Sequence, residues 1–336
     1  MIPAPAWADW NAGAAAAPWS VALEEQQMLL EPEGWTPVAW EVALATRPHR
    51  TVVGAAAELD GLRGSLDRSL ERQGLRAAVA GTHPSAEWDD VAVGRREPTF
   101  ALHVHVSVPE AELAVRALDG LRQHLPLLLA LSANSPFWQG RDTGLASARI
   151  PILAMVPRAP LPRRFGDYRS YVDTVAATPD PSCPGWDARL RPRQATVEVR
   201  IMDAQTRSDD AAALAALVQS LVRLHAEDAS RPDGLTPEAL DQNRFLAARD
   251  GMDADLVCAS GRWREHATDQ LAGVLRACGA VARELGCREA LRAVAELAER
   301  PGHLRQRAVA REHGLAGLVA ELHAQYAPRV SAAAAA

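Results

Sequence analysis

Residues 100–108 read FALHVHVSV, and apolar and polar side chains alternate along most of this stretch. His103, His105 and Ser107 lie on one face of an extended chain and Val104 and Val106 on the other, because successive side chains of a strand point to opposite faces. Alternation over this length predicts a β-strand. Its polar face is a candidate site, since strands hold functional side chains precisely.

Two further stretches show the same pattern, VALEEQQMLL at residues 21–30 and ATVEVRIMDA at residues 195–204. In the first, Glu24 and Gln26 share one face, and Glu25 lies on the other. The polar face of the second is predicted to carry Thr196, Glu198, Arg200 and Met202, and its other face Val197, Val199 and Ile201. Each strand therefore has one apolar face and one face with ionisable groups. This arrangement favours an antiparallel sheet with one face on helices and the other open.

Helical spacing of apolar residues fills the remainder of the chain. The predicted fold is α+β: an antiparallel β-sheet with a concave polar face and helices packed outside. We expect one catalytic domain over residues 20–327, with strands mainly in 20–205 and helices in 206–327. Residues 1–19 would be an N-terminal extension and residues 328–336 a low-complexity tail. The helical segments are predicted at 51–75, 109–133, 208–227, 236–252, 267–286 and 288–300, and long loops at 132–151 and 178–194.

Composition narrows the range of functions. The 336 residues carry a net charge of −6, which argues against a general nucleic-acid-binding protein. All 36 basic residues are arginines, so a phosphate loop that depends on lysine is excluded. No apolar run reaches the length of a membrane span, and the N-terminus lacks the pattern of a signal peptide. We therefore expect a cytoplasmic protein without membrane contact, with its four cysteines as free thiols.

The polar faces suggest a metal and phosphate site. Glu24 and Glu198 would supply carboxylates and His103 an imidazole, while Arg200 offers a planar fork for phosphate. Carboxylates together with substrate phosphates commonly bind Mg²⁺. The residues alone leave simpler interpretations open. Two histidines on a strand are often half-exposed surface groups, and a Glu-x-Arg pair is often a solvated ion pair of little energetic value. His83 could equally be a structural residue of a turn.

Several motifs, taken together, resemble the bacterial glutamate–cysteine ligase type 2 family, also called the carboxylate–amine ligase family. The resemblance implies a glutamine-synthetase-like fold with ATP and Mg²⁺ on the antiparallel sheet. It also implies that ATP phosphorylates the side-chain carboxylate of glutamate and that an amine, often that of cysteine, attacks the acyl phosphate to form an amide. Such a reaction belongs to the biosynthesis of glutathione or another small thiol. The motifs are AGTHP (80–84), LHVHVSVP (102–109), LPLLLALSANSPFWQGRDTGLASAR (125–149), PRQATVEVRIMDAQ (192–205) and QNRFLAARDGMDADL (242–256).

The resemblance also implies roles for individual residues. Glu198 and Arg200 would be catalytic. Members of the family commonly self-associate, so a homo-oligomer is open, although no stretch identifies an interface. The implied metal-binding residues are Glu24, Gln26, His103 and Glu198. The implied residues for ATP are His105, Arg200 and Arg141. The implied substrate-binding residues are Thr82, His83, Arg149, Asn243 and Arg244.

The sequence departs from the family pattern at two acidic positions. Gln26 stands where the family usually has a second glutamate, and an amide can coordinate a cation but brings no charge. Ala43 stands where another glutamate is expected, unless Glu41 replaces it. The chain is also short around residues 35–40 and 88–95. These departures leave two alternatives open: a diverged ligase that uses another amine in small-molecule biosynthesis, and a non-catalytic nucleotide-binding homologue.

Overall fold

The strands form a main antiparallel sheet whose order, β2-β1-β4-β8-β7, differs from the order along the chain. In this computed structural model the described residues are 6–14, 17–87, 99–154, 161–178, 185–228, 234–258, 261 and 263–326, without the side chains of 39–41. The strands are β1 (Val21–Glu31), β2 (Thr36–Ala45), β3 (Arg76–Ala78), β4 (Ala101–Ser107), β7 (Ala188–Arg191) and β8 (Thr196–Asp203), with the hairpins β5 (Phe137–Trp138)–β6 (Arg141–Asp142) and β9 (Asp255–Val257)–β10 (Arg264–His266).

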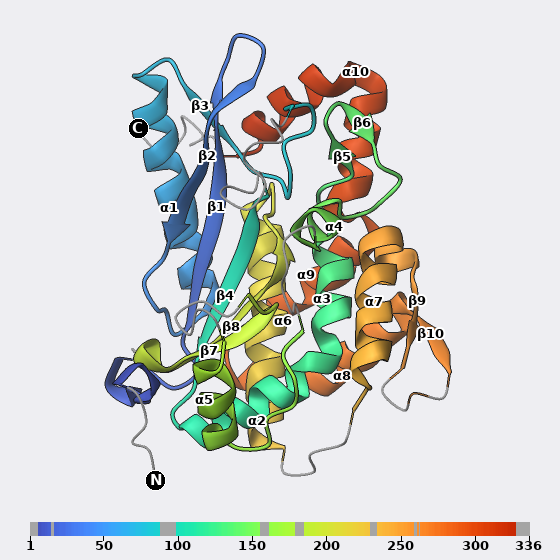
Figure 1. Cartoon of the computed structure of the whole chain (residues 1–336). Coiled ribbons are helices and arrows are strands. Elements are labelled where there is room, and N and C mark those ends of the chain that lie inside the picture. The colour runs from blue at the N-terminus through green and yellow to red at the C-terminus, as the bar shows by residue number, and fades with distance from the viewer. Residues whose placement is uncertain are drawn as a thin grey trace.

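Helices cover the apolar face of the sheet, as predicted (Figure 1). Helices α1, α2 and α6 contact the strands, and α8 and α9 pack against α6 from the outside. The helices are α1 (Val52–Glu71), α2 (Ala111–Leu121), α3 (Leu125–Ser132), α4 (Arg149–Ala154), α5 (Tyr168–Ala176), α6 (Ser208–Glu227), α7 (Pro237–Asp250), α8 (Ala267–Glu284), α9 (Arg288–Glu299) and α10 (Gly302–Ala324).

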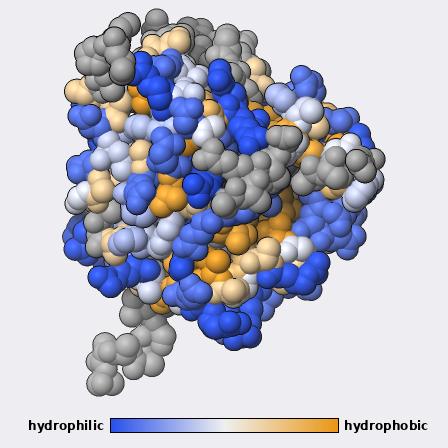
Figure 2. All heavy atoms as spheres, turned by 90° about the horizontal axis from the view of Figure 1, so that it is seen from below, coloured by the Kyte–Doolittle hydropathy of each residue, from blue (hydrophilic) through white to orange (hydrophobic). Residues whose placement is uncertain are grey.

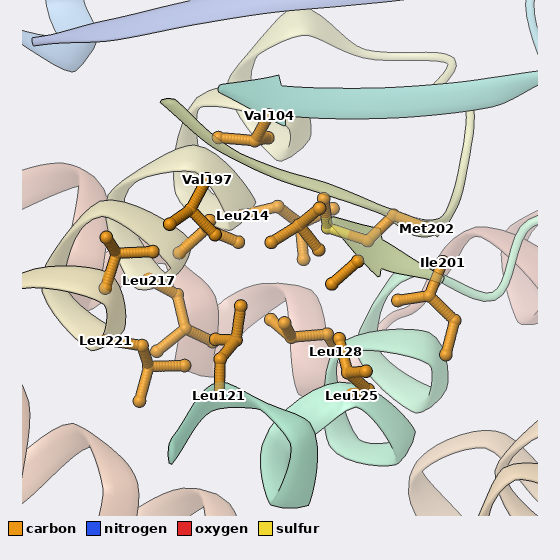
Figure 3. Close-up of a cluster of buried hydrophobic side chains, with 14 of the residues drawn as sticks. Val104, Leu121, Leu125, Leu128, Val197, Ile201, Met202, Leu214, Leu217 and Leu221 are labelled. Carbon is orange, nitrogen blue, oxygen red and sulfur yellow. The ribbon is translucent and has the colours of Figure 1, made fainter. Parts of the chain in front are cut away.

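The main hydrophobic core lies between the sheet and these helices. Val104 and Val197 project from the strands toward Leu121 of α2 and Leu217 of α6 (Figure 3). Met202 also points into this cluster, so its predicted place on the polar face is wrong. The register between β4 and β8 shifts between Leu102 and Val104. At a register shift of this kind one strand has an extra residue, which changes the face to which its following side chains point.

Two adjacent glutamates of β1, Glu24 and Glu25, point to opposite faces of the sheet. The Glu25 side chain points into the helical layer, where the charge of Arg63 from α1 neutralises it, and both side chains are fully buried. Glu24 points to the polar face and is 36% exposed. The inner acid therefore fixes β1 to α1, and the outer acid is available for chemistry.

The structure differs from the sequence prediction at the edge of the sheet. Strand β7 lies within residues 178–194, which were predicted to be a loop. It pairs with β8, with Arg189 opposite Glu198 and Arg191 opposite Thr196. This part of the prediction was wrong because β7 has only four residues and lies between Pro184 and Pro192. Cys258, Cys278 and Cys287 are buried and form no disulfide within the described residues, and Cys183, the fourth cysteine predicted to be a thiol, lies outside them.

The surface mixes hydrophilic and hydrophobic side chains. Seen from below, hydrophobic side chains gather in a hollow between hydrophilic groups (Figure 2). No helix in the described part of the chain is both long enough and apolar enough to cross a membrane.

Candidate active site

The polar face of the sheet brings five of the predicted site residues together. Glu24 comes from β1, His103 and His105 from β4, and Glu198 and Arg200 from β8. Antiparallel pairing places Glu24 opposite His103 and Glu198 opposite His105. The spacing of two residues along each strand thus becomes a compact cluster across three strands.

The two carboxylates converge on the two imidazoles. His103 Nδ1 lies 3.3 Å from Glu24 Oε1 and 3.7 Å from Glu198 Oε1. His105 Nε2 lies 3.8 Å from Glu24 Oε2 and 4.0 Å from Glu198 Oε1. Glu198 and His103 are nearly inaccessible, whereas Glu24 faces the opening. A ligand entering from solvent would therefore meet Glu24 first.

The charges of the cluster shift its ionisation. Hydrogen bonds with His103 and His105 hold the pKa of Glu24 well below its usual range. Burial lowers the pKa of His103 to about 4, and the hydrogen bond with Glu24 offsets only part of this effect. Burial favours the neutral form of Glu198, but its interactions with His105, Arg200 and Arg189 are stronger together and lower its pKa. At neutral pH both acids are therefore ionised and His103 is neutral.

Two arginines orient the Glu198 carboxylate from opposite sides. Arg200 Nη1 donates to Oε1 at 2.5 Å, and Arg189 Nε donates to Oε2 at 2.6 Å. Arg200 Nη1 also lies 3.5 Å from His103 Nδ1. Sequence reasoning missed Arg189 and its neighbour Arg191. Arg189 and Arg191 alternate along β7, but four residues are too few to show a period, and Arg193 lies beyond the strand.

Gln26 lies on the same face, and its side chain already makes a hydrogen bond to the protein. Its Oε1 accepts a hydrogen bond from the Ala101 backbone N–H at 2.8 Å. Its partner across the β1–β2 ladder is Ala43, so the two departures from the family pattern are neighbours. The predicted substitute Glu41 lies outside the described side chains.

Other predicted residues bind the protein itself. His83 Nε2 contacts the Trp35 carbonyl at 2.9 Å, and its Nδ1 accepts from the backbone N–H groups of Ser85 and Ala86. Thr82 Oγ1 donates to the Phe137 carbonyl at 2.8 Å. These bonds connect the loop around residue 83 to the turn after β1 and to the β5–β6 hairpin. The structural interpretation of His83 accounts for both of its ring nitrogens.

The remaining predicted residues also make structural contacts. Arg149 donates to the carbonyls of Ile201 and Arg200, which fixes the backbone of β8. The amide of Asn243 pairs with the backbone of Val257 through bonds of 2.8 and 2.7 Å.

Arg244 reaches the sheet, whereas Arg141 lies apart from the cluster. Arg244 Nε donates to Asp187 Oδ2 at 2.7 Å, just before β7. Arg141 is exposed on β6, and no hydrogen bond or ion pair within the described residues joins it to the strand cluster.

A second polar hub, which sequence reasoning missed, fixes the long loop at residues 132–151. Asp203, at the end of β8, accepts hydrogen bonds from the Asn134 backbone and from the hydroxyls of Ser135 and Ser147. Gln306 of α10 donates to both oxygens of Asn134 at 2.7 Å. The loop is thereby attached to the same strand that carries Glu198.

The sequence matches glutamate-cysteine ligase family 2 over residues 37–321. The chain belongs to this family. A protein from Rubrobacter xylanophilus, named provisionally as glutamate–cysteine ligase 2-3, is 37% identical over 91% of this chain and 96% of its own length. A relative from Leifsonia xyli, named provisionally as glutamate–cysteine ligase 2, is 33% identical over 81% of this chain and 79% of its own length. The predicted family and the enzyme class, an ATP-dependent ligase, are confirmed.

Solved structures agree with the predicted fold. Glutamate–cysteine ligase from Francisella tularensis, solved in complex with AMP, superposes with a TM-score of 0.68 at 13% identity and covers 95% of this chain and 91% of that one. A bifunctional glutathione synthetase from Pasteurella multocida superposes with a TM-score of 0.63 at 15% identity, over 92% of this chain and 52% of that one. The α+β fold with an antiparallel sheet is confirmed.

Proposed function

We propose that this carboxylate–amine ligase joins the side-chain carboxylate of glutamate to the amine of an amino acid such as cysteine, through an acyl phosphate. The observation that carries the proposal is the strand cluster, where Glu24 and Glu198 converge on His103 and Arg200 reaches the same carboxylate. Phosphoryl transfer needs positioning and neutralisation of charge more than it needs covalent help from the protein. The cluster offers both on a rigid sheet.

The donor set fits a magnesium ion that is shared with the substrate. Within the described residues, no group of three or more His, Cys, Asp or Glu side chains forms a metal site by itself. Mg²⁺ usually binds one or two carboxylates and completes its shell with substrate phosphates and water. Glu24 and Glu198 would hold the ion, with His103 beside them and Gln26 at the margin. Bound there, it would neutralise phosphate charge and polarise the phosphoryl group.

The first step would form a bond between a carboxylate oxygen of glutamate and the γ-phosphorus of ATP, and ADP would leave. Arg200, at the open side of Glu198, would hold the transferred phosphoryl oxygens through its fork. In the second step the uncharged amine nitrogen would attack the acyl carbon. The bond from that carbon to the phosphate oxygen would break and phosphate would leave, while the nitrogen gives up a proton. The departing phosphate, or water, would take that proton, because Glu24 has a low pKa and would hold the metal ion.

The test is ADP release from purified protein with ATP, Mg²⁺ and glutamate, measured against a panel of amines that includes cysteine. Mass spectrometry should identify a glutamyl amide. Glu198→Gln should lower kcat by at least about a hundredfold, because the neutral amide removes the charge between His103 and Arg200. The control is Glu31→Gln, at the exposed end of β1, which should leave the rate unchanged.

The outcomes separate the alternatives. An amide with an amine other than that of cysteine would establish the diverged ligase. Nucleotide that raises the melting temperature without being consumed would favour the non-catalytic homologue instead. Full activity of Glu198→Gln would show that the chemistry lies elsewhere on the chain.

A further inference from the structure

The strand cluster contains more positive charge than its own acids neutralise. Three guanidinium groups surround Glu198: Arg200 Nη1 at 2.5 Å, Arg189 Nε at 2.6 Å and Arg191 Nε at 3.7 Å. Glu24 is the second acid of the cluster. Three arginines thus face two carboxylates, before any charge on the imidazoles is counted. A surplus of this kind in a partly enclosed site favours an anionic ligand.

The three arginines differ in how accessible they are. The side chain of Arg189 is 6% exposed, and it holds Glu198 from behind. Arg200 is 24% exposed and lies beside His103, toward the proposed phosphoryl site. Arg191 is 31% exposed and makes the longest of the three contacts with Glu198. It is therefore the arginine best placed to receive a group from solvent.

The contacts of Arg191 leave its fork available. Its Nε donates to Gln194 Oε1 at 3.0 Å and lies near Glu198 Oε2. Within the described part of the chain, both contacts use Nε, so the two terminal nitrogens have no hydrogen-bond partner there. Those nitrogens are the pair that binds a carboxylate most effectively, through two parallel hydrogen bonds.

The position of Arg191 along the sheet indicates which anion it would bind. It pairs with Thr196, which lies two residues before Glu198 on β8, or roughly 6.6 Å along the strand. Arg200 lies beyond Glu198 in the opposite direction. The three carbons that separate the two carboxylates of glutamate span a distance of the same order. A glutamate with its side-chain carboxylate at Arg200 would bring its α-carboxylate toward Arg191, because both guanidinium groups lie next to Glu198.

Polar groups around Arg191 complete this subsite. Thr196 Oγ1 lies 3.5 Å from His105 Nδ1, and His105 Nε2 faces Glu24 and Glu198. These groups sit on the ordered strands β4 and β8. We propose that Arg191, with His105 and Thr196 beside it, binds the α-carboxylate of the amino acid whose side chain is activated. The proposal rests on the proposed ligase function.

The experiment measures initial rates of ADP release by the wild type and by Arg191→Gln, with glutamate varied at saturating ATP and ATP varied at saturating glutamate. The KM for glutamate should rise roughly ten- to a hundredfold, as expected for the loss of a charge-assisted bidentate contact. The kcat should change by less than about threefold, because Arg191 is placed away from the transferred phosphoryl group. Arg191→Lys keeps the charge but loses the fork, so it should recover only part of the affinity.

Arg193→Gln is the matched control, because Arg193 is two residues away, carries the same charge and is exposed. Its KM values should equal those of the wild type. An unchanged KM for glutamate in Arg191→Gln would overturn the subsite. A rise confined to ATP would overturn the carboxylate assignment and place a phosphate there. Failure of the proposed function would appear separately, as a wild type that releases no glutamate-dependent ADP.

Discussion

The buried pair between Arg63 and Glu25 sets the position of the strand that carries Glu24. Arg63 Nη2 contacts both oxygens of Glu25 at 2.7 Å, and both side chains are fully buried. The same guanidinium donates to the carbonyls of Gln205, Thr206 and Tyr326. It therefore joins α1 to β1, to the segment after β8 and to the end of the described chain.

Arg63→Met should lower the free energy of unfolding by about 3–5 kcal/mol, because the Glu25 charge stays buried without a partner. Unfolding entropy grows with chain length, so for 336 residues this corresponds to a fall in melting temperature of roughly 4–7 °C. The assay is thermal unfolding followed by circular dichroism at pH 7, at one fixed scan rate. Arg68→Met, an exposed position on α1, is the control and should change the melting temperature by less than about 1 °C.

The double variant Arg63→Met with Glu25→Leu decides between two explanations. If the lone buried charge causes the loss, removing Glu25 should recover more than half of it, since apolar residues of similar size replace buried ion pairs well. If the three carbonyl contacts cause the loss, the double variant should stay as unstable as the single one. A melting temperature of Arg63→Met equal to that of Arg68→Met would refute the reasoning altogether.

Three further changes test other parts of the structure. Gln26→Glu should lower the Mg²⁺ concentration needed for half-maximal ADP release, because it adds a negative charge at the margin of the metal site; an unchanged titration curve would contradict this. Gly302→Ala should destabilise the protein in urea unfolding, because a Cβ there would lie 2.1 Å from Asn134 Oδ1, whereas Gly279→Ala, with open space around it, should stabilise α8 by up to about 1 kcal/mol. Burial lowers the pKa of His83 from 6.5 to about 4, so the unfolded chain binds a proton in this window that the folded chain does not, and stability should rise with pH between 4 and 6.5. His83→Asn should reduce that slope by up to about 1.4 kcal/mol per pH unit, and equal slopes in urea titrations would argue against a buried neutral imidazole.

Much of the sheet could be predicted from sequence, because alternation is a local property. Strands β1, β4 and β8 show period-two patterns that need no knowledge of the fold, and their polar faces meet as predicted. Strand β7 was missed because its four residues are too few to show a period. The inward turn of Met202 was missed because a register shift depends on the partner strand.

The candidate site was predictable where one strand face carried the signal, and not where distant segments meet. Glu24, His103 and Glu198 could be assigned to one cluster from alternation together with the family resemblance. Arg189 and Arg191 could not, because they reach Glu198 only through the pairing of β7 with β8. The family motifs point to Asn243 and Arg149 as substrate-binding residues. The motifs do not reveal that both side chains bind backbone atoms of the protein.

The register of the sheet places Gln26 next to Ala43, the two positions at which the family resemblance implies a glutamate. Gln26 and Ala43 face each other across β1 and β2, two residues along β1 from Glu24, and Gln26 also contacts the start of β4. Like charges opposite each other on neighbouring strands repel, so neutral residues at both positions avoid that repulsion. The two neutral residues therefore lie together on the polar face. Elsewhere on this face, Glu24, His103 and Glu198 keep their mutual contacts, and the arginines of β7 and β8 leave that part more positive. We therefore expect anion binding at the polar face to depend strongly on these arginines, in addition to any metal ion.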